Sequence, residues 1–347
     1  MNANLVICVM LRAIYTLTNQ REMINIKKHF VMKTTLKIFL IALTSLTFLK
    51  QESVCAQQDP QYTQYIYNPL VINPAYAGNR GRTSILLLHR SQWVGLDGAP
   101  RTQNLSVHSP IGLGKVGLGF SLVNDALGPA RETNFSADFS YTIETGVEGK
   151  LSFGLKGTLN LLDVDFNRTN PFNLNDPLLQ NIDNKLSPNV GVGLFYHDDR
   201  FYAGISAPGL LQTDHFDRSG ANSAASFIAE ERIHYYGLAG YVFELSPTTK
   251  FKPSTLVKMV AGAPLAVDVN ANFLFYDKLT LGASYRWSAA LSGLVGFQIS
   301  DSMLVGFAYD RESTDLGNAT YNDGTYEVFL RFELFKEYNR MVTPRFF

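Results

Sequence analysis

The stretch that decides the fold is FSADFSYTI, residues 135–143, in which apolar or aromatic residues alternate one by one with serine, aspartate and threonine. A period of two is the signature of a β-strand, whose successive side chains point to opposite faces. The same alternation recurs as VGLGFSLV at 116–123, LSFGLKGTLNL at 151–161 and LTLGASYRW at 279–287. Each expected strand therefore has one apolar face and one face of small or polar residues.

About fourteen such segments of about ten residues follow residue 82. They are expected to start near residues 83, 103, 115, 133, 150, 189, 200, 234, 249, 266, 278, 290, 302 and 324. About ten residues is also the length that a tilted strand needs to cross a bilayer. The insertions 163–187 and 207–232 are rich in Asn, Asp and Ser and are expected to be loops at one end of the strands, opposite short turns. The sequence therefore predicts an all-β fold, an antiparallel transmembrane β-barrel over residues 83–347, and leaves open whether a tail or a longer closing strand follows residue 334.

The composition favours the barrel over soluble alternatives. Only 17% of the 347 residues are charged, against about 25% in ordinary soluble domains. A secreted, lectin-like β-sandwich would also alternate, but its outer face would be well charged. The 30 basic and 30 acidic residues give no basic surplus for binding nucleic acid. The interpretation is an integral protein of a bacterial outer membrane, in contact with lipid and not with nucleic acid.

The amino-terminal region is expected to be a cleavable export signal. A start at Met32 is followed by lysines, the apolar stretch Ile38–Leu49 and small residues that end at Ala56. The apolar stretch is shorter than the roughly 20 residues of a membrane helix. We therefore expect residues 1–56 to be an upstream extension plus signal peptide, cleaved after Ala56, and favour this over lipid attachment at Cys55.

No catalytic, cofactor or metal site is predicted. Cys8 and Cys55 both precede the expected cleavage site, so the mature chain offers no thiolate ligand. The six histidines, at 29, 89, 108, 197, 215 and 234, form no His-x-x-x-His pair. His89 or His108 with a strand serine stays open as a hydrolase arrangement, but a structural histidine is favoured. The sequence predicts a protein that is not an enzyme.

Two runs near the start of the mature chain are its most distinctive part. They are QYTQYIYNPLVINPAYAG at 61–78 and RSQWVGLDGAPRTQ at 90–103. With both runs, and with GASYR at 282–286 and AYD at 308–310, the chain resembles the PorP/SprF family of type IX secretion system outer-membrane proteins. It departs from the family pattern at 325–327, where Thr-Tyr-Glu replaces Ser-His-Glu, and at Phe346, which replaces a tyrosine.

This resemblance implies a barrel that serves secretion or gliding motility rather than solute uptake. The expected partners are a large secreted surface protein, often an adhesin, with a type IX C-terminal sorting domain, and periplasmic components of the secretion machine. A passive outer-membrane channel for small solutes is the alternative function.

Residues 57–82 are expected to form an irregular segment, because two Asn-Pro steps disfavour regular structure. The segment is expected to pack in or beneath the barrel mouth or to offer a periplasmic docking surface. A tail anchored by its aromatic residues at the membrane interface is the alternative. The candidate docking residues are Tyr62, Tyr65, Asn68, Pro69, Asn73, Pro74 and Tyr76.

The second run is expected to join two strands and to supply residues of the barrel interior. The candidate motif and lumen residues are Arg90, Trp93, Gly95, Gly98, Pro100, Arg101 and Arg286. The three arginines are expected to face the lumen, because a lipid-facing arginine at the bilayer midplane costs about 2–4 kcal/mol. Their expected partners are Asp138, Asp268 or Asp310, in structural ion pairs rather than substrate contacts. For Trp93 we favour an anchor at the membrane interface.

Overall fold

The computed structural model describes residues 61–112, 114–146, 149–166, 181–212, 232–314, 317 and 321–334. These residues form the strands β1 (Thr83–Ser91), β2 (Arg101–Ile111), β3 (Val116–Leu127), β4 (Ala130–Thr145), β5 (Gly149–Val164), β6 (Ile182–His197), β7 (Phe201–Ala207), β8 (His234–Tyr241), β9 (Phe243–Ser246), β10 (Thr249–Val260), β11 (Ala266–Phe275), β12 (Leu279–Arg286), β13 (Ala290–Ser300), β14 (Met303–Glu312) and β15 (Thr325–Leu334). A short 3-10 helix, η1 (Pro74–Tyr76), precedes them. The expected signal sequence and the region after residue 334 lie outside the described residues.

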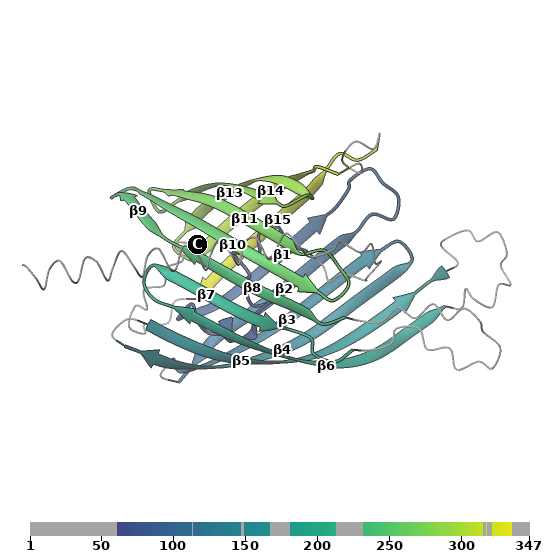
Figure 1. Cartoon of the computed structure of the whole chain (residues 1–347), viewed down its shortest axis with the longest axis horizontal. Coiled ribbons are helices and arrows are strands. Elements are labelled where there is room, and N and C mark those ends of the chain that lie inside the picture. The colour runs from purple at the N-terminus through teal and green to yellow at the C-terminus, as the bar shows by residue number, and fades with distance from the viewer. Residues whose placement is uncertain are drawn as a thin grey trace, which may run out of the picture. The chain divides into compact units, whose positions relative to one another are not determined.

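The strands pair into one closed antiparallel sheet (Figure 1). Neighbours in the chain pair with each other, and β15 pairs with β1, so that Thr83 lies opposite Leu334 and Ser91 opposite Tyr326. β8 and β9 both pair with β10 and together make one interrupted strand. The described ring therefore has fourteen strands, and the predicted antiparallel barrel is confirmed.

Most strands start within a few residues of the positions expected from the alternation, with one clear difference at β6. This strand begins at Ile182, not near residue 189, and β5 continues to Val164. The expected loop 163–187 is therefore shorter at both ends. The Asn and Asp residues that suggested a loop bond to each other at the strand ends, where the Asn184 amide donates to the Asp163 carboxylate at 2.7 Å.

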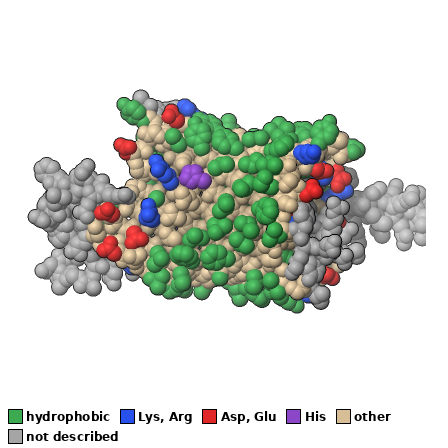
Figure 2. All heavy atoms as spheres, turned by 180° about the vertical axis from the view of Figure 1, so that it is seen from behind, with side chains coloured by type: hydrophobic (Ala, Val, Ile, Leu, Met, Phe, Trp, Pro, Cys, Tyr) green, Lys and Arg blue, Asp and Glu red, His purple; other side chains and the backbone are tan. Residues whose placement is uncertain are grey.

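The two faces of the barrel differ in polarity. Figure 2 shows a broad apolar surface on one side of the barrel, and the exposed side chains include Leu118, Phe139 and Leu155. The neighbouring positions of the same strands point into the lumen and are small or polar, as at Ser140 and Ser152. An apolar outer band around a polar interior is the arrangement of a barrel in lipid.

No helix among the described residues is long and apolar enough to cross a membrane.

The connections differ between the two ends of the barrel. At one end every turn has four residues or fewer, as at 112–115 and 301–302. At the other end lie the longer connections 92–100, 165–181, 208–233 and 313–324. We call these the short-turn end and the long-loop end. In outer-membrane barrels short turns face the periplasm and long loops face the exterior.

Candidate functional site

Residues 61–82 lie inside the barrel, and we call them the lumen segment. Its apolar side chains are buried against lumen-facing residues of the wall, such as Leu88, Phe195 and Phe329, and together they form the hydrophobic core. The candidate docking residues Tyr62, Tyr65, Asn68, Pro69, Asn73, Pro74 and Tyr76 are all buried there. Whether a partner docks on them stays a prediction.

The lumen segment runs along the lumen from the long-loop end to the short-turn end. Near its start the amide of Thr63 donates to Glu327, at the beginning of β15. Near its end the amide of Gly78 donates to His108, close to the β2–β3 turn. The chain then turns back on itself and enters β1. The segment therefore extends through the length of the barrel interior.

The two Asn-Pro steps hold the lumen segment to the wall. Asn68 donates its side-chain amide to Asn104 Oδ1 at 2.8 Å and to Ser106 Oγ at 2.9 Å. Asn73 accepts the amide of Ala75, which caps η1, and donates to the Leu194 carbonyl at 3.0 Å. Proline offers no amide that would need a partner in this enclosed space.

Lumen-facing glycines let the segment approach the wall backbone directly. A Cβ atom on Gly154 would collide with the backbone of Ala75, one on Gly117 with the Ala77 carbonyl, and one on Gly193 with the Asn73 side chain. Gly157, which faces outward from the same strand as Gly154, has open space instead. The glycines at lumen positions thus serve close backbone approach.

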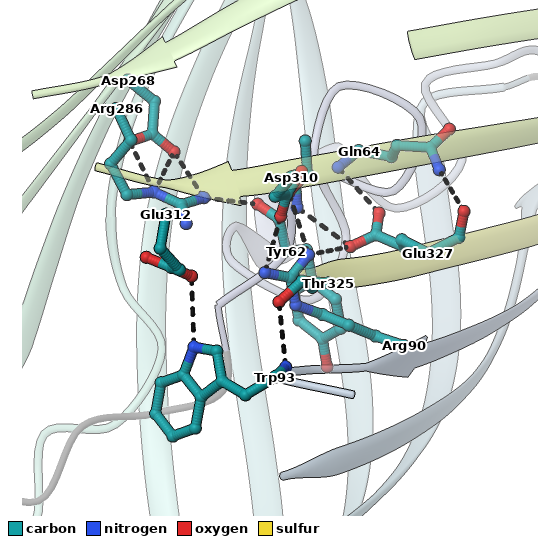
Figure 3. Close-up of polar contacts among 11 residues, drawn as sticks. Tyr62, Gln64, Arg90, Trp93, Asp268, Arg286, Asp310, Glu312, Thr325 and Glu327 are labelled. Carbon is teal, nitrogen blue, oxygen red and sulfur yellow. Dashed lines mark hydrogen bonds and ion pairs between the residues drawn. The ribbon is translucent and has the colours of Figure 1, made fainter. Parts of the chain in front are cut away.

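A buried charge cluster holds the start of the segment, and we call it the long-loop clamp (Arg90, Asp310 and Glu327 with the amides of Thr63 and Gln64). Arg90 contacts Asp310 and Glu327, each at 2.9 Å, and all three side chains are about 1% exposed or less (Figure 3). Glu327 also accepts the amides of Thr63 at 3.0 Å and Gln64 at 2.8 Å. One wall carboxylate therefore binds both the wall arginine and the segment backbone.

Of the other charged residues expected in the lumen, Arg286, Asp268 and Asp138 lie there and Arg101 does not. Arg286 pairs with Asp268 at 3.0 Å, also in the lumen (Figure 3). Asp138 pairs with Lys156 at 3.0 Å and not with an arginine. Arg101 is exposed and shares the outward face of β2 with Gln103, so the structure does not place it in the lumen.

A second cluster holds the end of the segment, and we call it the short-turn clamp (Arg80, Arg82, Arg331 and Glu333). Glu333 contacts Arg80, Arg82 at 3.2 Å and Arg331 at 3.2 Å. Here the segment supplies two of the arginines and the wall supplies the carboxylate.

Residues 92–100 form a loop that is tied down on both sides at the long-loop end. Val94 exchanges backbone hydrogen bonds with Gly324 at 2.9 Å and Asp323 at 2.8 Å. On the other side the Gly98 carbonyl accepts the amide of Gly128 at 2.9 Å.

The motif residues of this loop fit those contacts. Gly95 has a φ of +103° and a Cβ there would collide with the Tyr321 carbonyl. The Trp93 indole donates to Glu312 at 3.2 Å (Figure 3). Pro100 is buried, and its carbonyl accepts the amide of Gln92 at 3.0 Å.

A cavity of about 110 Å³ remains between the lumen segment and the wall, lined by apolar residues such as Ile72 and Val123 and by polar ones such as Ser121, Lys156 and Asn160. This is room for a few water molecules. No group of three or more His, Cys, Asp or Glu side chains that could hold a metal ion occurs among the described residues.

Sequence reasoning missed Glu327, Glu333, Lys156 and the role of the lumen glycines. Lys156 was detectable, because it lies directly opposite Asp138 once β4 and β5 are paired through their short turn. The two glutamates required the pairing of the first and last strands, for which the sequence carries no local signal.

Comparison with known families shows which protein family this chain belongs to. A family model described as "Type IX secretion system membrane protein PorP/SprF" matches residues 54–332. The chain belongs to the PorP/SprF family. The PorP/SprF match includes the lumen segment, the loop 92–100 and both carboxylates of the long-loop clamp. As a PorP/SprF protein with a closed barrel and an apolar outer face, it is an integral outer-membrane component of type IX secretion.

Solved structures similar to this PorP/SprF barrel are outer-membrane barrels of low identity. The outer membrane protein Omp33 of Acinetobacter baumannii is 10% identical, with a TM-score of 0.42, over 73% of this chain and 98% of that one. The CymD monoaromatic hydrocarbon channel is 11% identical, with a TM-score of 0.47, over 82% and 96%. The P. putida toluene transporter TodX is 8% identical, with a TM-score of 0.42, over 78% and 95%. No curated protein matches the PorP/SprF chain.

Proposed function

We propose that this PorP/SprF protein is a non-enzymatic component of type IX secretion that helps to export a large, adhesin-like surface protein or to retain it on the cell. Its partners would be that secreted protein, through a C-terminal sorting domain, and periplasmic components of the secretion and gliding machinery. Family membership supports the secretion context.

The observation that carries the proposal against a solute channel is the filled lumen. The lumen segment is buried along its length, its backbone contacts wall glycines, and charge clusters hold both of its ends. A passive channel needs an open aqueous path, as in porins. A closed barrel is instead suited to presenting its two ends to partners.

Docking of a partner on the lumen segment itself remains part of the proposal, but it requires the segment to become accessible. Because Tyr65, Asn73 and Tyr76 are at most 4% exposed, a partner reaches them only when the segment leaves the lumen. The alternative within the same function is docking on the loops while the segment stays in place.

A variant whose lumen segment is covalently fixed to the wall distinguishes docking on the released segment from docking on the loops. Asn68 of the lumen segment donates to Ser106 on β2, and the chain has no cysteine after Cys55. An N68C/S106C disulfide, formed in the oxidising periplasm, would fix the segment to β2. Each single-cysteine variant is the matched control.

The proposal is tested by deleting the gene in its host and complementing it with the wild type or the locked variant. We expect deletion to remove one large secreted protein from the surface, measured by surface proteomics, with small-solute uptake unchanged. Loss of solute uptake with an unchanged surface proteome would favour the channel instead. Normal display by the locked variant would exclude docking on a released segment while leaving the secretion role standing.

A further inference from the structure

The outward faces of β1–β4 change from apolar to basic in register as they approach the long-loop end. The last apolar row across these strands consists of cross-strand partners and is formed by Leu87, Leu105, Leu122 and Phe135. Two residues further toward the long loops, the next outward row is His89, Gln103, Asn124 and Thr133. The row after that is Ser91, Arg101, Ala126 and Arg131. On β1–β4 the basic residues therefore begin where the apolar rows end.

We call His89, Arg101 and Arg131 the border patch. All three side chains are exposed, and Figure 2 shows basic side chains beside a histidine at one border of the apolar face. Within the described part of the chain, neither arginine has an ion pair or a side-chain hydrogen bond. His89 contacts Ser91 Oγ at 3.0 Å. The border patch thus holds two arginines that no described residue pairs with.

On the outward faces of β1–β5, one acidic residue lies near the patch. Asp163 lies opposite Arg131 on β5, and its carboxylate accepts the Asn184 amide at 2.7 Å. Glu132 and Asp125 point to the other face, where Glu132 accepts from Asn160 and Asp125 from Thr102. On this strand surface the two arginines thus outnumber the single carboxylate.

The spacing of the two arginines suits a single small anion. Arg101 and Arg131 are both cross-strand partners of Ala126, so one strand separates them. Neighbouring strands lie about 4.8 Å apart, which places the two backbones about 10 Å apart. The small side chain of Ala126 leaves the space between them open, and two guanidinium groups can converge there on the oxygens of one phosphate.

We propose that the border patch binds a phosphate group of lipopolysaccharide in the outer leaflet. The long-loop end faces the exterior in such barrels, and exposed basic residues at headgroup depth recognise lipid phosphates. Lipid A carries its phosphates at the boundary between acyl chains and sugars, which is the position of the patch relative to the apolar band. The proposal does not depend on the secretion role.

The test uses the full mature protein in detergent, with phosphorylated lipid A, dephosphorylated lipid A and inorganic phosphate as separate probes, and native mass spectrometry as the measurement. We expect the R101A/R131A variant to bind phosphorylated lipid A about tenfold more weakly than the wild type, because two charge-assisted contacts are lost. R101K/R131K keeps the charges and should retain most of the binding. R200A removes an exposed arginine at the short-turn end and is the matched control.

The outcomes divide clearly. A wild-type preference for phosphorylated lipid A that the double alanine variant loses, while its heat-modifiable migration on gels stays normal, supports the site. Equal binding of both lipid A forms, or unchanged binding by R101A/R131A, overturns it. Saturation by inorganic phosphate at the concentration that saturates lipid A would assign the patch to free phosphate and would also overturn it. A double variant that fails to migrate normally is replaced by the single variants R101A and R131A, which are read by the same criteria.

Discussion

The two clamps of the lumen segment are built with opposite charge patterns. At the long-loop end one arginine lies between two wall carboxylates, and the segment contributes backbone amides. At the short-turn end three arginines surround one carboxylate, and the segment contributes two of them. The first clamp is almost fully buried, whereas the side chain of Arg82 in the second is 31% exposed. Because water and salt weaken exposed pairs, the long-loop clamp should hold the segment more strongly.

The largest effect is expected from E327Q. The change removes the charge that faces Arg90 and weakens two backbone hydrogen bonds to the segment. Arg90 keeps Asp310 as a partner, so the loss comes from the charge-assisted hydrogen bonds that Glu327 accepts from Arg90, Thr63 and Gln64, and we expect it to total about 3–5 kcal/mol. Urea unfolding in detergent measures this loss. A loss no larger than that of E333Q would contradict the difference between the clamps.

A change in the middle of the lumen segment's contact surface tests whether the two clamps alone hold the segment in place. G154A adds a methyl group that collides with the backbone of Ala75, and overpacking of this kind costs about 1–3 kcal/mol. G157A, outward on the same strand with open space, is the matched control. We also expect G154A to raise single-channel conductance in planar bilayers. Identical stability and conductance for the two variants would show that the close contact is not needed.

E333Q should have a smaller effect that depends on salt. It leaves Arg80, Arg82 and Arg331 close together without their shared carboxylate. We expect a loss of about 1–2 kcal/mol. Raising the salt concentration should reduce this loss, because screening weakens both the lost attraction and the remaining repulsion. The measurement is the unfolding free energy of E333Q and E327Q at low and high salt. The same salt response in both variants would contradict the difference in exposure between the two clamps.

The smallest effect is expected from W93F. The change removes the hydrogen bond from the half-buried indole to Glu312, which lies outside both clamps. One such bond contributes about 0.5–1.5 kcal/mol. W287F, at an indole that is 69% exposed, is the control and should be neutral. Equal losses for the two variants would make Trp93 an interface residue only.

The barrel was predictable because alternation is a local property of the chain. In FSADFSYTI the period of two assigns each residue to a face, and the structure exposes Phe135 and buries Ser136 accordingly. The same rule applied to β2 places Arg101 with Gln103 on the outward face, opposite to Thr102. The expectation that Arg90, Arg101 and Arg286 all face the lumen overrode that parity. Arg101, at the end of its strand, lies beyond the apolar row where the cost of exposure to lipid applies.

The site was less predictable because it depends on contacts between distant parts of the chain. Charge alone named Arg90 and Arg286 as lumen residues and Asp310 and Asp268 as candidate partners, but not which pairs form; the structure pairs Arg90 with Asp310 and Arg286 with Asp268. The partnership of Glu327 with Thr63 joins residues 264 positions apart and exists only in the closed ring. Likewise, the glycines of the wall were visible as small residues, but no local pattern shows that residues 61–82 need their space.

The seam between β1 and β15 joins two requirements of the fold in a single strand. The lumen segment comes before all fifteen described strands, while Glu327 and Glu333, which hold it, lie on β15, the last strand that the structure describes. A truncated chain without β15 would lack the partner of β1 and both fasteners at once. Closing the ring and fixing the lumen segment in place therefore both depend on β15.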